Sequence, residues 1–156
     1  MTLSITYQEL QQLAADKLHQ NVELQSVDNN VLTATINTSI KKIVTINVQA
    51  SAELKLSMQA KDLYVDYRIL SIKNNKSALL SRLIDAASPN IVNVVLNYLS
   101  SKYPQYNDIV KKVPNADKLC IHLAAIPQLQ GALQHVELES VVPSLYGLEI
   151  AVRLKN

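Results

Sequence analysis

The chain has 156 residues, of which 48% are hydrophobic and 18% are charged, so the sequence predicts one ordered domain over residues 1–156. The formal net charge of +2 is too balanced to indicate a nucleic-acid partner. One cysteine and two glycines exclude an internal disulfide, a cysteine-rich zinc site and a glycine-rich phosphate loop. No catalytic signature and no typical metal-ligand spacing is present, so we expect a protein that is not an enzyme and that carries no metal or other cofactor.

The first residues lack the basic and apolar regions of a signal peptide, and no apolar run reaches the roughly 18 residues of a membrane-spanning helix. We therefore expect a cytoplasmic protein if Met1 is the native start. A location in the cell envelope would follow if a leader had been trimmed ahead of Met1.

The first predicted element is a helix from Tyr7 to His19. Thr6 followed by Glu9 is a capping box, in which each side chain accepts a hydrogen bond from the backbone N–H of the other residue. Apolar residues then recur at helical spacing, beginning with Leu10 and Leu13.

Strand patterns follow this helix. Residues 22–25 alternate between apolar and polar, residues 31–38 are rich in β-branched side chains, and residues 39–42 are predicted to form a turn. The longest pattern runs from Val44 to Ala60, where every even-numbered residue is apolar and every odd-numbered residue is polar. A period of two over this length predicts one strand with a dry face and a wet face.

A strand of this length would span about 55 Å, whereas a compact domain of this size has a radius of gyration of about 15 Å. Either the strand bends strongly around the rest of the molecule, or the molecule is elongated. A hairpin near Ala50 to Ala52 is the alternative to one long strand. Residues 62–72 predict a further strand and complete a meander of four or five antiparallel strands.

The period then changes to that of a helix. One predicted helix runs from Ser77 to Ala87, and a second carries the apolar residues of 91–99. Between them Ser88 is a candidate N-cap and Pro89 a first helical residue, so the helix pair from Ser77 to Ser101 is predicted to break within two residues of Pro89. Residues 106–113 are predicted to add one or two turns.

The tail returns to strands. These are predicted at residues 118–123, 135–142 and 146–154, with a short helix at 127–134. Cys120 and His122 share one face of the first of them, and we interpret them as a small buried thiol beside a rim histidine. The functional alternative is the nucleophile and base of a hydrolase, which no nucleophile-elbow motif supports.

Basic residues are in excess over residues 73–118, which contain seven Lys or Arg and three Asp, and Tyr98, Tyr103 and Tyr106 lie among them. Such a surface suits a membrane surface with anionic lipid or a protein partner. A solvated face is the commoner explanation of the same pattern.

The closing segment resembles part of a known superfamily. It reads Cys120-Ile121-His122-Leu123, Ile126-Pro127-Gln128-Leu129, Val136-Glu137-Leu138-Glu139 and Gly147-Leu148-Glu149-Ile150-Ala151-Val152. This order of a strand, a short helix opened by Ile-Pro and two strands ending in Gly-Leu resembles the order found in the tubular lipid-binding (TULIP) superfamily. Its small bacterial DUF1439-type members and its synaptotagmin-like mitochondrial lipid-binding (SMP) domains are the most similar. The resemblance implies a curved sheet that wraps a long helix and encloses an apolar groove.

We therefore expect an α+β fold, in which a strongly curved antiparallel meander sheet wraps around a long, Pro-interrupted helix. The expected function is non-catalytic binding of a lipid or another elongated apolar ligand between sheet and helix. The predicted groove residues are Val48, Ala50, Ala52, Leu54, Leu83, Ile84, Ala87, Val92 and Leu96, and the candidate headgroup contacts are Lys111 and Lys112. The alternative is a protein–protein interaction or scaffold domain with a closed core.

Overall fold

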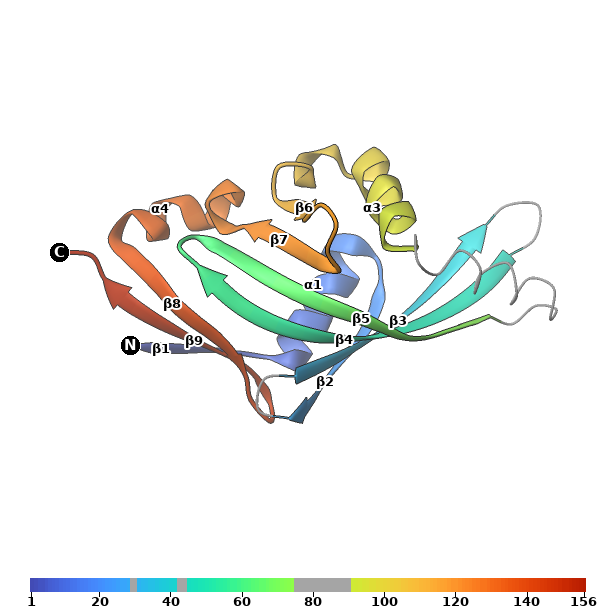
Figure 1. Ribbon diagram of the computed structural model, residues 1–156, viewed down its shortest axis with the longest axis horizontal. Helices are drawn as coiled ribbons and strands as arrows, with labels where there is room; N and C mark the ends of the chain where they lie inside the picture. Colours follow the sequence, from blue (N-terminus) through green and yellow to red (C-terminus); the bar gives the residue numbers. More distant parts are fainter. Residues whose placement is uncertain (29–30, 42–44, 75–90) are drawn as a thin grey trace.

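The computed structural model describes residues 1–28, 31–41, 45–74 and 91–156 (Figure 1). These residues form an α+β fold with two antiparallel sheets and short helices. The larger sheet has the strand order β2 (Asn21–Asp28), β3 (Val31–Lys41), β4 (Thr45–Gln59), β5 (Asp62–Asn74), β7 (Lys118–His122) and β6 (Val110–Lys112). The smaller sheet has the order β1 (Thr2–Thr6), β9 (Gly147–Leu154) and β8 (Val136–Pro143). The helices are α1 (Tyr7–Leu18), α3 (Ile91–Lys102) and α4 (Pro127–His135), with single 3₁₀ turns η2 (Pro104–Tyr106) and η3 (Leu123–Ala125).

Helix α1 begins at the predicted capping box. The backbone N–H of Glu9 donates to Thr6 Oγ1 at 3.1 Å, and the backbone N–H of Thr6 donates to Glu9 Oε2 at 2.7 Å. The helix ends at Leu18, one residue before the predicted end, because His19 adopts a left-handed conformation with φ of 52°. The helix then covers the free edge of β2, where the backbone N–H of Leu24 donates to the side chain of Gln11 at 2.9 Å.

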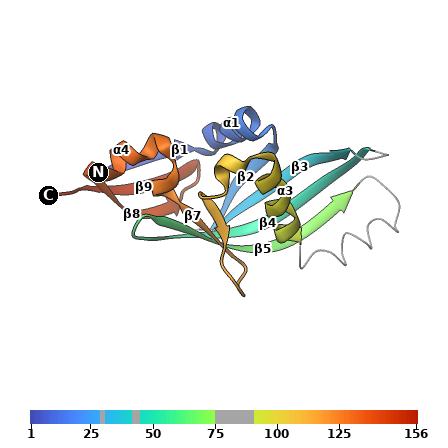
Figure 2. The ribbon, with the colours of Figure 1, turned by 90° about the horizontal axis from the view of Figure 1, so that it is seen from above.

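The long strand predicted from the alternating pattern is confirmed. Strand β4 is continuous over its 15 residues, so the hairpin considered near Ala50 is wrong. Strand β3 pairs with it as far as Lys41, which makes the predicted turn at residues 39–41 wrong as well. At about 3.3 Å per residue, β4 extends roughly 50 Å. Figures 1 and 2 show how the molecule accommodates this length: β3, β4 and β5 run along its long axis, and the smaller sheet and α4 lie at one end.

The expected wrapping of a strongly curved sheet around a long helix is not found in the part of the chain that the structure describes. The sheets there are not strongly curled, and the helices do not exceed 12 residues. The physical reason is that the long strands are accommodated by elongation, the second of the two options that their length left open. The second predicted helix is confirmed as α3, whereas residues 77–87 and the break at Ser88-Pro89 lie outside the described residues.

The smaller sheet joins the two ends of the described chain. Strand β1 pairs with β9 in antiparallel register from Thr2 opposite Ala151 to Thr6 opposite Gly147. The hydroxyl of Tyr7 donates to the backbone oxygen of Ser144 at 2.7 Å, which fixes the start of α1 against the turn between β8 and β9. Strand β8 in turn lies against β4, so the two sheets contact each other there.

The core is thin. Among the described residues, the buried hydrophobic side chains are those of Tyr7, Leu32, Val65, Cys120, Leu133, Val141 and Val152. These lie partly in the larger sheet and partly around the smaller one. No described helix is long and apolar enough to cross a membrane.

The segment after α3 differs from the prediction. One 3₁₀ turn forms at Pro104–Tyr106, but residues 110–112 form the edge strand β6 and not a further helical turn. Pairing decides this: Val110 and Lys112 lie opposite Ile121 and Leu119 of β7.

Candidate functional site

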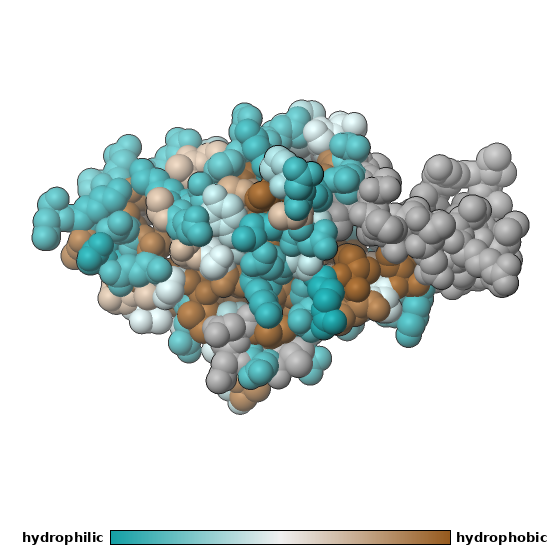
Figure 3. Space-filling view, viewed as in Figure 1, coloured by the Kyte–Doolittle hydropathy of each residue, from teal (hydrophilic) through white to brown (hydrophobic). Residues whose placement is uncertain are grey.

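The larger sheet has an apolar face that runs across its long strands. Directly paired residues of antiparallel strands point to the same side, so the register defines this face. It comprises Leu32, Ala34 and Ile36 on β3, Val48, Ala50, Ala52, Leu54, Leu56 and Met58 on β4, Leu63, Val65, Tyr67, Ile69 and Ile72 on β5, and Leu119 and Ile121 on β7. Hydrophobic side chains gather along these strands in the space-filling view (Figure 3).

Burial is uneven across the apolar face. Leu32 and Val65 are almost fully buried, with 4% and 6% of their surface exposed. Ile36 on the same face is 38% exposed, although it lies directly opposite Ala50 in the middle of the long hairpin. The apolar face is therefore closed near Leu32 and Val65 and accessible near Ile36.

A bulge at Leu70 keeps the side chains of Ile69 and Ile72, on either side of it in β5, on the apolar face. Ile69 pairs with Ala52 and Ile72 pairs with Ala50, so three steps along β5 correspond to two along β4. Leu70 has no partner in this register and is 47% exposed. Without the extra residue, Ile72 would point to the opposite side of the sheet.

The opposite face is polar, which confirms the division read from the alternation. Thr35 and Ser51 share a hydrogen bond of 3.0 Å across β3 and β4. Arg68 donates to Glu53 at 2.9 Å across β4 and β5. Both pairs come from the odd-numbered residues of β4, as the sequence pattern predicts.

The structure describes six of the nine predicted groove residues. Val48, Ala50, Ala52 and Leu54 are half-buried on the apolar face, and Leu96 of α3 is also half-buried. Val92 lies in α3, one turn before Leu96. Leu83, Ile84 and Ala87 lie outside the described residues.

The two predicted headgroup lysines do not act together. Lys111 pairs with Cys120 and therefore lies on the face opposite the apolar one. Lys112 pairs with Leu119 on the apolar side, but its ammonium donates to the backbone oxygen of Ala116 at 3.0 Å. Adjacent residues of a strand point to opposite sides, so only Lys112 remains on the side of the predicted groove.

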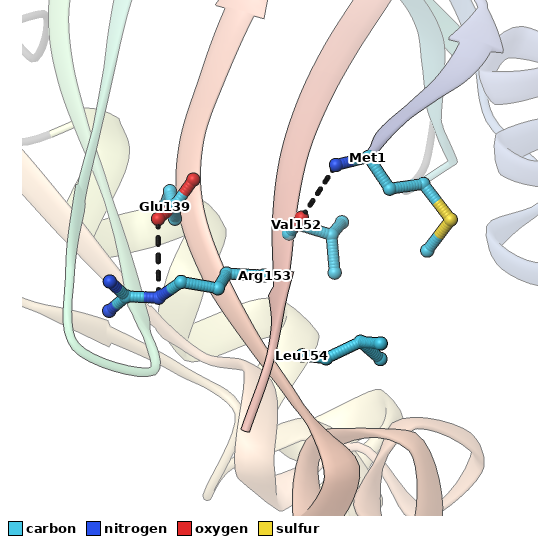
Figure 4. A pocket seen from close by; sticks show the side chains of 5 residues that line it. All are labelled: Met1, Glu139, Val152, Arg153 and Leu154. Carbon is cyan, nitrogen blue, oxygen red and sulfur yellow. Dashed lines mark hydrogen bonds and ion pairs between the residues drawn. The ribbon is translucent and has the colours of Figure 1, made fainter. Parts of the chain in front are cut away.

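Two shallow hollows are found elsewhere on the described surface. One has a volume of about 400 Å³ and is lined by Met1, Glu139, Val152, Arg153 and Leu154 (Figure 4). Its walls are tied by the N-terminal ammonium, which donates to the Val152 oxygen at 3.0 Å, and by the Arg153–Glu139 ion pair at 3.4 Å. The other, of about 300 Å³, lies between α1 and β2 and is lined by residues such as Gln11, Ala15 and Val22. Neither is lined by residues of β4 or α3.

A cluster of chemically active side chains lies on the polar face. Asp62 pairs directly with His122, and Cys120 is two residues before His122 on the same side of β7. Nδ1 of His122 lies 2.8 Å from Asp62 Oδ1 and 3.9 Å from Cys120 Sγ. The thiol is buried, whereas the side chains of His122 and Asp62 are 35% and 32% exposed. This agrees with the interpretation as a buried thiol beside a rim histidine.

The cluster does not have the geometry of a hydrolase. In a nucleophile–base–carboxylate triad, the histidine uses one ring nitrogen toward the nucleophile and the other toward the carboxylate. Here the same nitrogen, Nδ1 of His122, faces both the Cys120 sulfur and the Asp62 carboxylate. A proton that Nδ1 donates to Asp62 prevents the same atom from accepting the thiol proton.

Tyr64 completes the cluster from the neighbouring strand. It pairs directly with Cys120, and the interaction with Cys120 raises the pKa of the Tyr64 phenol.

The sequence did not reveal this cluster because the carboxylate that joins Cys120 and His122 lies far from them along the chain. The register of β5 against β7 brings Asp62 to them from 60 residues away. The available signal was Asp62 at the start of a predicted strand, and the pairing of that strand with residues 118–122 was not foreseen.

Comparisons of the chain with protein-family models, with curated proteins and with solved structures gave no match, so the likeness to the tubular lipid-binding superfamily remains a similarity of sequence pattern.

Proposed function

We propose that the protein binds a lipid or another elongated apolar ligand on its apolar face, without catalysis. The observation that carries the proposal is the incomplete burial of that face. Val48, Ala50, Ala52 and Leu54 are only half-buried, and Ile36 beside them is 38% exposed. A face of uninterrupted aliphatic residues along about 50 Å of strand has the length and chemistry for an extended hydrocarbon chain.

The driving force would be burial of apolar surface. Each methylene group removed from water contributes about 0.8 kcal/mol, so ten methylenes of an acyl chain supply roughly 8 kcal/mol before the costs of association are subtracted. The small side chains of Ala50 and Ala52 would let such a chain approach the middle of β4 closely. The pattern likeness to the tubular lipid-binding superfamily supports the same ligand class, although the proposal requires no strongly curled sheet.

Native mass spectrometry of protein purified under mild conditions tests the proposal. We expect a co-purified lipid mass and a rise in the melting temperature when the lipid is added back, because a ligand that binds only the folded state stabilises it. A protein without bound lipid that gains no thermal stability from any added lipid would contradict the proposal.

Two variants of β3 sharpen the test. Ile36→Lys places a charge on the apolar face and should abolish the lipid mass. Thr33→Lys places the same charge on the polar face, opposite Glu53, and should leave lipid binding unchanged. Equal lipid binding by both variants would show that the ligand does not occupy the apolar face.

A protein partner is the alternative occupant of the apolar face. It is favoured by the position of the two hollows, neither of which is lined by β4 or α3. In that case native mass spectra would show a second polypeptide in place of a lipid, and the Ile36→Lys substitution would remove it.

A further inference from the structure

Three potential metal ligands of different chemistry converge on the polar face. The Oδ1 atom of Asp62, the Sγ atom of Cys120 and the Nδ1 atom of His122 all lie within 4.8 Å of one another. They come from two directly paired strands, so the backbone ladder of β5 and β7 fixes their relative positions. This cluster lies on the opposite face from the proposed lipid surface and does not depend on it.

The distances suit a tetrahedral ion after small side-chain adjustments. Bonds of about 2.0–2.3 Å place the donors of a tetrahedral zinc ion roughly 3.3–3.6 Å apart. The Nδ1 and Oδ1 atoms are 2.8 Å apart and the Nδ1 and Sγ atoms 3.9 Å apart, so the first pair must open and the second must close by a few tenths of an ångström. The Oδ1 and Sγ atoms, which lie within 4.8 Å of each other, must also close to this spacing. Rotation of the Asp62 and His122 side chains, each about one-third exposed, can supply these movements.

The donor set points to the kind of ion. A thiolate with an imidazole and a carboxylate matches Zn²⁺, whereas Mg²⁺ and Ca²⁺ prefer oxygen ligands alone. We propose that Asp62, Cys120 and His122 bind one Zn²⁺ ion through Oδ1, Sγ and Nδ1, with the fourth position open to solvent on the exposed side of the cluster.

Binding changes the protonation of two ligands. The thiol of Cys120 releases its proton to solvent and binds as the thiolate. The neutral ring of His122 carries its one proton on Nε2, which frees the Nδ1 lone pair for the ion and breaks the hydrogen bond to Asp62. The thiolate and the carboxylate then balance the two positive charges of the ion.

The surroundings contain both a supporting and an opposing group. Tyr64 lies directly opposite Cys120 on β5, in the position of an outer-shell partner of the sulfur. Lys118 lies two residues before Cys120 on the same face, but its ammonium is held away by Asp66 at 3.5 Å and lies over the Tyr64 ring. Lys111, opposite Cys120 on β6, is exposed and opposes the ion through its charge.

Zinc titration of untagged, chelator-treated and reduced protein tests the site, with a chromophoric chelator as competitor. We expect one Zn²⁺ per chain. Loss of an outer-shell partner alone lowers affinity about 10–100-fold, so Cys120→Ser should lower it at least about 100-fold. Asp62→Asn and His122→Gln, on the exposed side of the cluster, should each lower it at least about 10-fold, and they keep the test decisive if Cys120→Ser does not fold.

Two controls and one spectrum complete the experiment. Asp16→Asn, in α1, and His135→Gln, at the end of α4, should leave zinc affinity unchanged. Co²⁺ in place of Zn²⁺ should give the near-ultraviolet absorption of a thiolate–cobalt bond. Zinc affinity that is equal in the wild type, Asp62→Asn and His122→Gln, or a cobalt complex without that absorption, would overturn the proposal.

Discussion

The two glycines of the chain provide a matched pair of substitutions with opposite expected effects. Gly147 begins β9 and lies against β1, where an added Cβ would overlap the carbonyl oxygen of Ile5 and lie 2.7 Å from the Cα of Thr6. Both of these are backbone atoms, so no side-chain rotation can relieve the contact. Gly131 lies inside α4 with no atom within 4 Å of the position of an added Cβ.

The magnitudes follow from these surroundings. Gly147→Ala forces β1 and β9 apart and should cost about 1–3 kcal/mol of unfolding free energy. Gly131→Ala removes the entropic cost of a glycine in a helix and should add about 0.5–1 kcal/mol. For a domain of this size each kcal/mol corresponds to about 2–4 °C, so we expect melting temperatures lowered by roughly 2–12 °C and raised by roughly 1–4 °C, respectively.

Differential scanning calorimetry or far-ultraviolet circular dichroism measures both changes. The contrast between the two variants is the test, since both replace Gly by Ala. A Gly147→Ala protein that melts at or above the wild-type temperature would refute the close approach of β1 to β9 and, with it, the pairing that closes the smaller sheet.

Three further expectations concern α1 and the core. Thr6→Ala removes the capping hydroxyl and should lower the unfolding free energy by about 0.5–2 kcal/mol in urea denaturation. The hydrogen bonds from the backbone and side chain of Thr6 lower the pKa of the Glu9 carboxyl. Their contribution to stability is therefore present above the unfolded pKa of about 4.3 and is lost as the pH falls through the folded value. A nuclear magnetic resonance titration of Glu9 in the Thr6→Ala variant should show this pKa moving upward. Tyr7→Phe leaves the Ser144 oxygen without its donor and should cost about 1 kcal/mol, and an unchanged urea midpoint would argue against that hydrogen bond. Leu133→Ala, at a side chain that is 4% exposed, should cost about 2–5 kcal/mol, and a cost below 1 kcal/mol would mean that α4 does not close the core.

Local signals in the sequence were sufficient to predict helix α1 and strand β4. The capping box at Thr6 and Glu9 places the start of α1 within one turn of chain, and a strict period of two over β4 identifies both its extent and its two faces. The α+β class and the antiparallel pairing follow from the same patterns. Each of these features is decided by residues within a few positions of one another.

The features that were missed depend on partners far away in the chain. Strand β1 was not predicted, and residues 2–6 form a strand because they pair with β9, about 145 residues later. Strand β6 has only three residues and forms against β7. The pairing of Ile40 with Ile46 extends β3 through a stretch whose lysines and serine resemble a turn. The strong curvature was inferred from the strand length together with the resemblance to a superfamily of curved sheets, and elongation accommodates the same length equally well.

The bulge at Leu70 has a consequence for how the gene can change. Losing one codon within a strand normally moves every later side chain to the other side of the sheet. Here the codon for Leu70 specifies the one unpaired residue of the β4–β5 ladder, so its deletion would give a regular ladder with the residues on either side still facing as before. The middle of a long strand, usually the least tolerant place for a length change, thus contains a position at which related chains can differ by one residue and keep the same two faces.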